Sequence, residues 1–524
     1  MTTVSRSVFL LLGICSAVIL LQRIHARAEP LESDTALFSV LAQEWRQGRP
    51  LYSDLWDNKP PGLMLTYATA QAAVGQGPRS ILLLGSFASI LTLFGLYATA
   101  IRMTGDRRAG VWAAIFWALI NATPYLEANQ PLAEVFVNAC WVWAAAWGFR
   151  AVERGTIWDF FRAGSFLAMA SFYKHHLVIA DVAFVLGIAG AGRTTNENPR
   201  ALLRTLFWLA LPTIILWAST FGYFTLTHRF RALWETLVIS SRYYAAGSHP
   251  GLAGWLSNLL DSVRPSIWHF LMARGVFYIL APLAAGALPA IVAAIFLKDR
   301  RWIAWSGYAA AAWIGLTIPG HFFPHYYQVL LPPLVLAAGA LPSLLERFSG
   351  IRHPRLLTVL PTAFATLLLF KEAAFYRLSP EDCSRLKYGE VYITIRKMGE
   401  EIDRNLPPGE TFYELGCEAG LYYYSQRRPP TGILMSDHWD SGPLQASFME
   451  RIRRDLLRKA PLLLVTTRFW LANKELRQLP LAQWCFERYQ ELPQDSRHGP
   501  FVLFIRRDRL LEARKASRHS HQIP

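Results

Sequence analysis

The chain has 524 residues, of which 53% are hydrophobic and 13% aromatic, and its formal net charge is +16. Soluble domains are about 45–50% apolar and lack repeated stretches of about 20 apolar residues, so the composition excludes a soluble globular protein. It also argues against a nucleic-acid partner. In membrane proteins Lys and Arg collect in cytoplasmic loops, and no basic stripe with interleaved aromatic residues lies in a polar segment of this chain.

Apolar stretches recur along the chain and predict membrane-spanning helices. They lie at residues 7–21, 81–101, 202–226, 276–297 and 356–370. The three central stretches are long enough to cross a bilayer as helices. Together with shorter apolar runs they predict a polytopic α-helical membrane protein of about eleven spans over residues 1–375.

Short basic connectors alternate with acidic or histidine-rich ones and set the predicted topology. The basic connectors are residues 102–108, 149–154, 192–200, 298–301 and 347–355. The positive-inside rule puts them in the cytoplasm, with the amino terminus, and exports everything after about Phe375. The first apolar stretch is compatible with a retained span or with a cleaved signal peptide ending near Ala28, and Arg23 and His25 favour the span. Either alternative leaves the later topology unchanged.

The first exported loop, residues 25–76, is the most unusual polar segment of the membrane part. Asp34 begins an amphipathic, helix-like run and is a candidate general base. The alternative is that Ser33 or Asp34 only caps that helix, for which both residue types are suited. The later run 63–74 is too short to span and predicts a helix at the membrane interface.

The same loop ends in Asp57, Asn58 and Lys59, followed by the stiff pair Pro60-Pro61. A rigid turn of this kind can aim three polar side chains at a substrate. The alternative is a simple Asp-Lys turn pair at the membrane interface.

Three further candidates lie near the exported ends of predicted spans. Glu134 begins a span, and a carboxylate there is costly unless it faces a cavity or pairs with a cation such as Lys174. Lys174 and His175 interrupt an otherwise apolar stretch, which favours a functional role such as neutralising a phosphate.

A late exported loop contributes His321, His325 and Tyr326. These side chains can hydrogen-bond to a phosphate or a sugar, although packing in an interfacial aromatic belt also explains the tyrosine. A divalent metal held by the two histidines stays open, but Pro324 argues against the regular helix that such a pair needs.

Residues 376–524 differ in composition from the membrane part. Helix-like runs at 391–406 and 447–459 alternate with strand-like runs at 411–416, 461–467 and 501–507. The alternation predicts an exported C-terminal α/β domain. No phosphate-binding glycine loop occurs in it, which favours a structural or acceptor-positioning role over catalysis. A disulfide between Cys383 and Cys417 stays open, whereas the absence of C-x-x-C disfavours a zinc site.

Several motifs resemble, in the same order, those of bacterial family 39-type glycosyltransferases of the GT-C class, relatives of the protein O-mannosyltransferases and of the lipid A aminoarabinose transferase. The motifs are DTALF (34–38), GRPLYSDLWDNKPPG (48–62), NQPLAEVF (129–136), SFYKHH (171–176) and GHFFPHYYQVLLPPLVLAAGA (320–340). The resemblance covers residues 1–375. Thr35 stands where many relatives carry a second acidic residue, and His175 where Gln is common.

The resemblance implies transfer of a sugar from a polyprenyl phosphate donor to an acceptor hydroxyl, on the exported face of a bacterial inner membrane. It implies catalytic roles for Asp34 and Asp57, and contacts to the departing phosphate or the sugar from the other polar residues of these loops. No cofactor is expected, and the acceptor can be a lipid, a glycan or a protein. The competing class is a transporter or flippase of lipid-linked sugars. Such proteins often have repeated halves with sites near the bilayer midplane, whereas this sequence shows no repeat and gathers its polar residues at one face.

Overall fold

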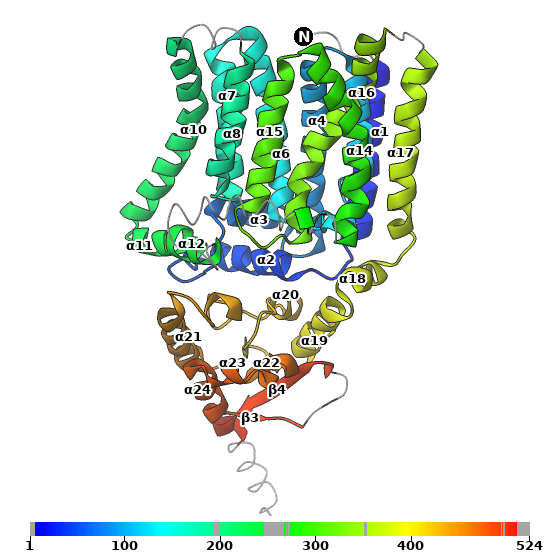
Figure 1. The fold of residues 1–524 in the computed structure, drawn as a ribbon. Coiled ribbons are helices and arrows are strands. Elements are labelled where there is room, and N and C mark those ends of the chain that lie inside the picture. Colours follow the sequence, from blue (N-terminus) through cyan, green and yellow to red (C-terminus); the bar gives the residue numbers. More distant parts are fainter. Residues whose placement is uncertain are drawn as a thin grey trace, which may run out of the picture.

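The computed structural model describes residues 6–192, 199–245, 267, 268, 270, 273–350, 354–493, 495 and 498–510. It has three parts along one axis: a bundle of helices, a layer of short helices across one end of the bundle, and a small domain with a sheet beyond that layer (Figure 1). The amino-terminal end of the bundle lies opposite the small domain.

Seven helices of the described chain are long and apolar enough to cross a membrane. They are α1 (Arg6–Ala26), α4 (Pro78–Thr104), α6 (Ala133–Arg154), α10 (Pro199–Leu226), α14 (Arg274–Leu297), α16 (Leu331–Ser349) with the 3-10 turn before it (Pro324–Leu330), and α17 (Pro354–Tyr376). Four shorter helices of 14 to 17 residues complete the bundle: α5 (Arg107–Ile120), α7 (Ile157–Tyr173), α8 (Leu177–Ala191) and α15 (Arg301–Thr317). The predicted polytopic helical membrane protein is confirmed, and these eleven bundle helices agree with the predicted number of spans.

Small residues allow close approach of neighbouring helices in the bundle. A Cβ added at Gly187 of α8 would lie 2.7 Å from the Cα of Gly307 of α15, so these two backbones touch. Similarly, a Cβ at Gly164 of α7 would meet the carbonyl oxygen of Leu209 of α10 at 2.2 Å. Between apolar surfaces in a bilayer, such close packing is a main source of helix association.

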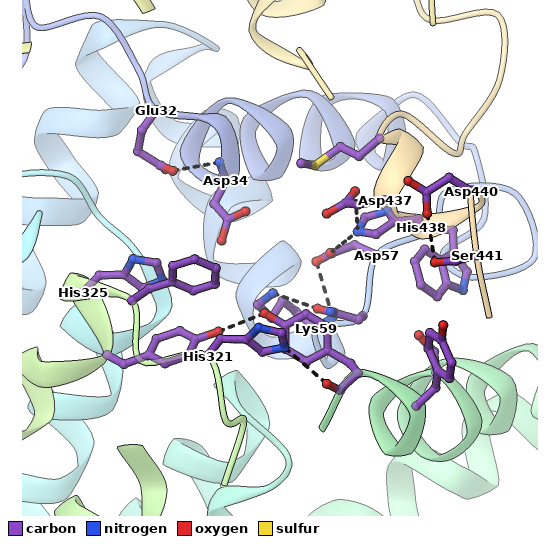
Figure 2. A pocket seen from close by; sticks show the side chains of 18 of the residues that line it. Glu32, Asp34, Asp57, Lys59, His321, His325, Asp437, His438, Asp440 and Ser441 are labelled. Carbon is purple, nitrogen blue, oxygen red and sulfur yellow. Dashed lines mark hydrogen bonds and ion pairs between the residues drawn. The ribbon is translucent and has the colours of Figure 1, made fainter. Parts of the chain in front are cut away.

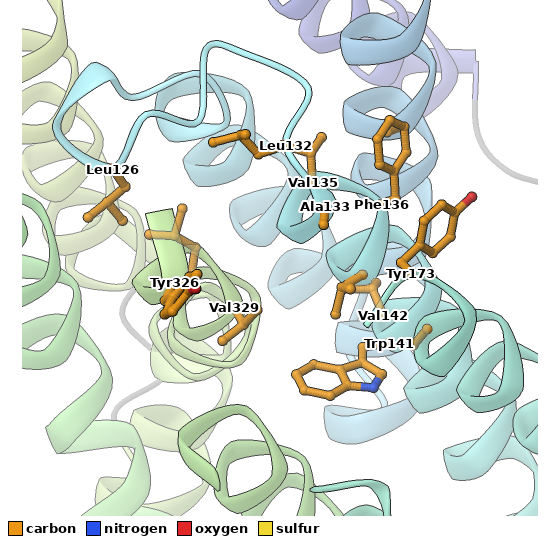
Figure 3. Packing of buried hydrophobic residues seen from close by; sticks show 14 of the residues in the cluster. Leu126, Leu132, Ala133, Val135, Phe136, Trp141, Val142, Tyr173, Tyr326 and Val329 are labelled. Carbon is orange, nitrogen blue, oxygen red and sulfur yellow. The ribbon is translucent and has the colours of Figure 1, made fainter. Parts of the chain in front are cut away.

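The ends of α6 and α7 nearest the small domain are fixed by aromatic packing (Figure 3). The rings of Phe136 and Tyr173 stack with their centroids 5.2 Å apart, and Trp141 is fully buried below them. This packing holds the start of α6 beside the end of α7. It therefore brings Glu134 and Lys174, which neighbour these aromatic residues in sequence, to the same place.

The layer across the end of the bundle contains α2 (Ser33–Arg46), α3 (Pro61–Val74), α11 (Phe230–Trp234), a π-helical turn (Glu235–Ser240) and α12 (Ser241–Ala245). Figure 1 shows α2 and α3 at the bundle end that faces the small domain. The predicted helix over residues 63–74 is present as α3, and its place at the membrane interface stays a prediction. A Cβ at Gly62 of α3 would lie 2.4 Å from the Phe172 carbonyl oxygen, so α3 is pressed onto the end of α7.

The small domain combines helices with a four-stranded sheet in the order β1-β2-β4-β3. Strand β1 (Phe412–Glu414) pairs in parallel with β2 (Leu463–Thr467), while β4 (Phe501–Arg506) is antiparallel to β2 and to β3 (Tyr489–Glu491). Its helices are α18 (Pro380–Tyr388), α19 (Val391–Asn405), α20 (Gly420–Ser425), α21 (Gln445–Lys459), α22 (Arg468–Ala472), α23 (Lys474–Gln478) and α24 (Pro480–Arg488). The predicted C-terminal α/β domain is confirmed, whereas its division from the membrane part at residue 375 stays a prediction.

The disulfide considered between Cys383 and Cys417 does not form, because both cysteines are free in the structure. The Cys383 thiol faces the Phe375 carbonyl oxygen at 3.4 Å, and Cys417 Sγ lies 3.0 Å from Ser436 Oγ. The two thiols therefore serve different local contacts, one at the end of α17 and one behind β1.

The first loop joins the bundle to the small domain through polar contacts along its length. Arg428 of the domain pairs with Glu44 at the end of α2 at 2.9 Å, and the Trp56 backbone N–H donates to Gly432 O at 2.9 Å. A Cβ at Gly432 would lie 2.0 Å from the Asp54 carbonyl oxygen, so only glycine permits this approach. The domain consequently forms a second wall opposite the bundle end.

Candidate active site between the bundle and the small domain

A cavity of about 600 Å³ lies between the helix layer and the small domain (Figure 2). The polar residues that line it come from six separate segments of the described chain. They are Glu32, Asp34, Asp57, Asn58 and Lys59 of the first loop, Glu127, then Ser240, Tyr243, Tyr244, His321, His325 and Tyr326 of later loops, and Tyr388, Tyr392, Asp437, His438, Asp440 and Ser441 of the domain. Seven of the ten candidate residues from the sequence are in this group.

Glu32, not Ser33 or Asp34, is the residue that caps α2. Its carboxylate accepts hydrogen bonds from the backbone N–H groups of Asp34, at 2.9 Å, and of Thr35. Burial, with the nearby Asp34 carboxylate as a second cause, raises the pKa of Glu32 to about 7. Asp34 is left in the first turn with its carboxylate extending into the cavity, as Figure 2 shows.

In the Asp57–Lys59 turn Asp57 is buried, Asn58 and Lys59 are half-buried, and hydrogen bonds hold all three in place. Lys59 Nζ donates to Asn58 Oδ1 at 2.7 Å, and the Lys59 backbone N–H donates to Asp57 Oδ2 at 3.3 Å. The Tyr52 hydroxyl fixes the turn from behind by donating to Lys59 O at 2.8 Å. Burial opposes the charge of Lys59, but the carboxylates of Asp57 and Asp34 outweigh it and raise the pKa of Lys59. Lys59 is thus a firmly cationic group in an otherwise acidic cavity.

Glu134 and Lys174 form an ion pair, which is one of the two alternatives that the sequence left open. Both side chains are buried, and Lys174 Nζ also lies 4.1 Å from the centroid of the Tyr326 ring. Lys174 and His175 border a smaller cavity of about 60 Å³ that shares Asn58, Lys59, Tyr244 and Tyr326 with the larger one. The pair therefore lies behind Lys59, toward the bundle.

The late loop meets the cavity through three separate contacts. His325 Nδ1 lies 2.7 Å from Glu127 Oε2, Tyr326 shares a hydrogen bond of 3.2 Å with the Tyr244 hydroxyl, and His321 Nε2 lies 3.2 Å from Tyr244 O. Residues 324–330 form a 3-10 turn, not an α-helix, and each histidine has its own partner. Among the described residues no group of three or more His, Cys, Asp or Glu side chains is arranged to hold a metal ion.

The sequence did not identify the contribution of the small domain. His438 Nε2 lies 4.0 Å from Asp57 Oδ1 and 3.9 Å from Asp437 Oδ1, so it connects the domain to the first loop. Its ring also packs edge-on against Trp56, with centroids 4.7 Å apart. The run SDHWDS at 436–441, dense in polar and aromatic groups between two predicted elements, is the signal that marks this loop.

No model of a protein family matches this sequence, and no curated protein matches it. Solved structures do match. The crystal structure of ArnT from Cupriavidus metallidurans bound to undecaprenyl phosphate superposes with a TM-score of 0.56 at 13% identity, covering 95% of this chain and 97% of that one. The apo structure of the same protein gives 0.55 with the same identity and coverage. ArnT is the lipid A aminoarabinose transferase, a GT-C glycosyltransferase. The membrane fold that the motifs predicted is confirmed: this chain has an ArnT-like fold over nearly its whole length.

Proposed function

We propose that this protein transfers a sugar from a polyprenyl phosphate to an acceptor hydroxyl in the cavity between bundle and domain. The observation that carries the proposal is the meeting of a carboxylate, Asp34, and a cation, Lys59, in one cavity at the end of a membrane-spanning bundle. A lipid-linked donor delivers its phosphosugar at such a place while its tail stays in the bilayer. The ArnT structure that shares this fold holds undecaprenyl phosphate, which is a lipid of that class.

Asp34 is the general base of the proposed reaction. Glu32 already supplies the helix cap, and among the described residues nothing donates a hydrogen bond to the Asp34 side chain. The carboxylate takes the proton of the acceptor hydroxyl as that oxygen attacks the anomeric carbon of the donor. The bond from that carbon to the phosphate oxygen breaks, and its electron pair leaves on the polyprenyl phosphate. General-base catalysis of this kind contributes about 10²–10⁴-fold to a rate.

Lys59 stabilises the negative charge that develops on the departing phosphate. A cation that is already fixed beside the departing phosphate acts strongly on such charge, because it needs no reorganisation during the reaction. Asp57 and Asn58 hold Lys59 in place, and the Glu134–Lys174 pair lies behind it. The side chains of His175, His321, His325 and Tyr326 supply further hydrogen bonds to phosphate or sugar.

The cavity lies on the exported side of a bacterial inner membrane in this proposal. The basic connectors support the orientation, since several of them meet at the bundle end away from the domain. Arg108 pairs there with Glu346, and Arg347 pairs with Asp299 at 2.9 Å. Successive bundle helices run in opposite directions, so these connectors and the cavity are at opposite ends of the bundle.

Binding of undecaprenyl phosphate to the purified full-length protein tests the donor half of the proposal. Lys59→Met should weaken binding about tenfold or more, because a charge-assisted hydrogen bond is lost. Lys474→Met is the matched control, since Lys474 is exposed and lines neither of the two cavities described above, and it should bind as the wild type does. Equal binding by Lys59→Met and the control would contradict the assignment of Lys59.

A further inference from the structure

The cavity has two walls of different chemistry. The wall built from the first loop and the bundle carries Lys59, with Lys174 behind it. The opposite wall comes from the small domain, and α12 of the helix layer meets it at Tyr243. The described residues of the domain that line the cavity include neither Lys nor Arg. Instead this wall presents the carboxylates of Asp437 and Asp440 together with the Ser441 hydroxyl.

The polar groups of the domain wall are only partly satisfied within the protein. Ser441 Oγ donates to Asp440 Oδ1 at 2.9 Å, whereas the Asp437 side chain is 59% exposed. The His438 side chain is only 10% exposed, and its Nδ1 is buried with no hydrogen-bond partner among the described residues. The exposed Asp437 carboxylate is therefore accessible to a ligand in the cavity, and the Asp440–Ser441 pair lines the cavity beside it.

An aromatic ring borders the same wall. Tyr243 of α12 is 49% exposed and lines the cavity. It packs against the backbone of the domain loop at Gly442, where φ is +85° and an added Cβ would lie 2.8 Å from the ring. The ring is therefore held in place by the loop and still has half of its surface free.

We propose that this wall binds the acceptor, and that the acceptor group is an uncharged sugar. The inference rests on the proposed function and specifies its second substrate. Ionised carboxylates only accept hydrogen bonds, and the hydroxyl groups of a sugar donate them. An aromatic face covers the apolar C–H face of a sugar ring. A phosphate-bearing acceptor is excluded by the same wall, because two carboxylates would repel it and no lysine or arginine among the described lining residues of that wall would offset the repulsion.

Sugar binding by the full-length protein in lipid nanodiscs tests the inference, with maltose as a neutral probe and saturation-transfer NMR as the readout. Combined Asp437→Ala and Asp440→Ala substitutions should weaken maltose binding about tenfold or more, since several hydrogen bonds to charged groups are lost. Tyr243→Ala should also weaken binding, whereas Tyr243→Phe should keep it, because the ring and not the hydroxyl makes the contact. Asp403→Asn, an exposed carboxylate elsewhere on the domain, is the matched control.

Undecaprenyl phosphate binding by the same variants separates this inference from the proposed function. The domain-wall variants should bind the lipid as the wild type does, while Lys59→Met should not. Maltose binding that is absent in the wild type, or unchanged in both Tyr243→Ala and the Asp437/Asp440 variant, would overturn the inference alone. The inference would also be overturned if glucose 1-phosphate displaced maltose from the wild type and bound more weakly to the Asp437/Asp440 variant. That result would show that the wall binds a phosphate-bearing sugar. Unchanged lipid binding in Lys59→Met would instead count against the donor site.

Discussion

Two carboxylates at the start of α2 have different tasks because of their positions on the helix. Glu32 precedes the helix and satisfies two of its free backbone N–H groups, while Asp34 lies in the first turn and extends into the cavity. Sequence alone could not separate them, since Glu is not among the residue types preferred as helix caps. Because Glu32 supplies the helix cap, the Asp34 carboxylate is available to act as the proposed general base.

Replacing Asp34 should therefore abolish sugar transfer without unfolding the protein. We expect Asp34→Asn and Asp34→Ala each to lower the rate about 10²–10⁴-fold, because neither side chain can accept the proton. Both should unfold within about 1 kcal/mol of the wild type, since the cap is intact and only a helix-dipole interaction is lost. Thermal unfolding and a transfer assay on the same preparations measure both effects. A fully active Asp34→Asn protein would move the base to Asp57.

The raised pKa of Glu32 predicts a dependence of stability on pH. In the folded protein this carboxyl holds its proton up to about pH 7, whereas in the unfolded chain it ionises near its model value of 4.5. The folded state therefore binds more protons between these values, and this group makes stability fall as pH rises from about 4.5 to 7. Glu32→Gln removes the titration, so the wild type should lose more stability than the variant across that window. If the wild type and Glu32→Gln lost the same stability between about pH 4.5 and 7, the raised pKa of Glu32 would be contradicted.

At the scale of elements, the ends of α6 and α7 are joined by a buried ion pair. Lys174→Met would leave the Glu134 carboxylate buried without its partner and should cost about 3–5 kcal/mol of stability. The double variant Lys174→Met/Glu134→Gln should recover most of that loss, because no buried charge is then unpaired. Unfolding in detergent measures both, with Lys474→Met as the control for removing a lysine. If Lys174→Met were as stable as Lys474→Met, the Glu134–Lys174 ion pair would contribute little to stability.

The longest elements of the first loop and of the domain were predictable from local sequence, whereas the short helices α18, α22, α23 and α24 were not predicted. The amphipathic run after Asp34 became α2, and the runs at 391–406 and 447–459 became α19 and α21. Strand β3 and helix α20 are short and carry too little periodicity to be predicted. The direction of β4 also depends on pairing with β2, which no local pattern specifies.

The site was only partly predictable for a similar reason. Asp34, Asp57 and Lys59 stand out in sequence because they lie in a long polar loop between apolar stretches. His438 and its neighbours belong to a polar loop of a soluble domain, where such residues are ordinary. Their role depends on how the domain packs against the first loop, through contacts such as Gly432 with Asp54.

At the scale of the whole molecule, the small domain and the basic connectors lie at opposite ends of the bundle. We therefore expect the domain outside the cytoplasm and the basic connectors inside it. An alkaline phosphatase reporter, which is active only outside the cytoplasm, should work when it is fused after Arg377. A fusion at Asp299, in a basic connector of the opposite face, is the matched control and should be inactive. The reverse pattern would put the cavity in the cytoplasm and contradict the proposed delivery of the donor.

Mass spectrometry of polyprenyl phosphate sugars and surface glycans, after deletion of the gene, tests the central claim most directly. The account predicts that one lipid-linked sugar accumulates and that the same sugar disappears from a surface glycan. The wild-type gene and Asp403→Asn should reverse both changes, and Asp34→Asn should reverse neither. A flippase would leave the lipid-linked sugar on the cytoplasmic leaflet and would tolerate Asp34→Asn. Unchanged lipid-linked sugars and glycans in the deletion strain, or full rescue by Asp34→Asn, would contradict the account.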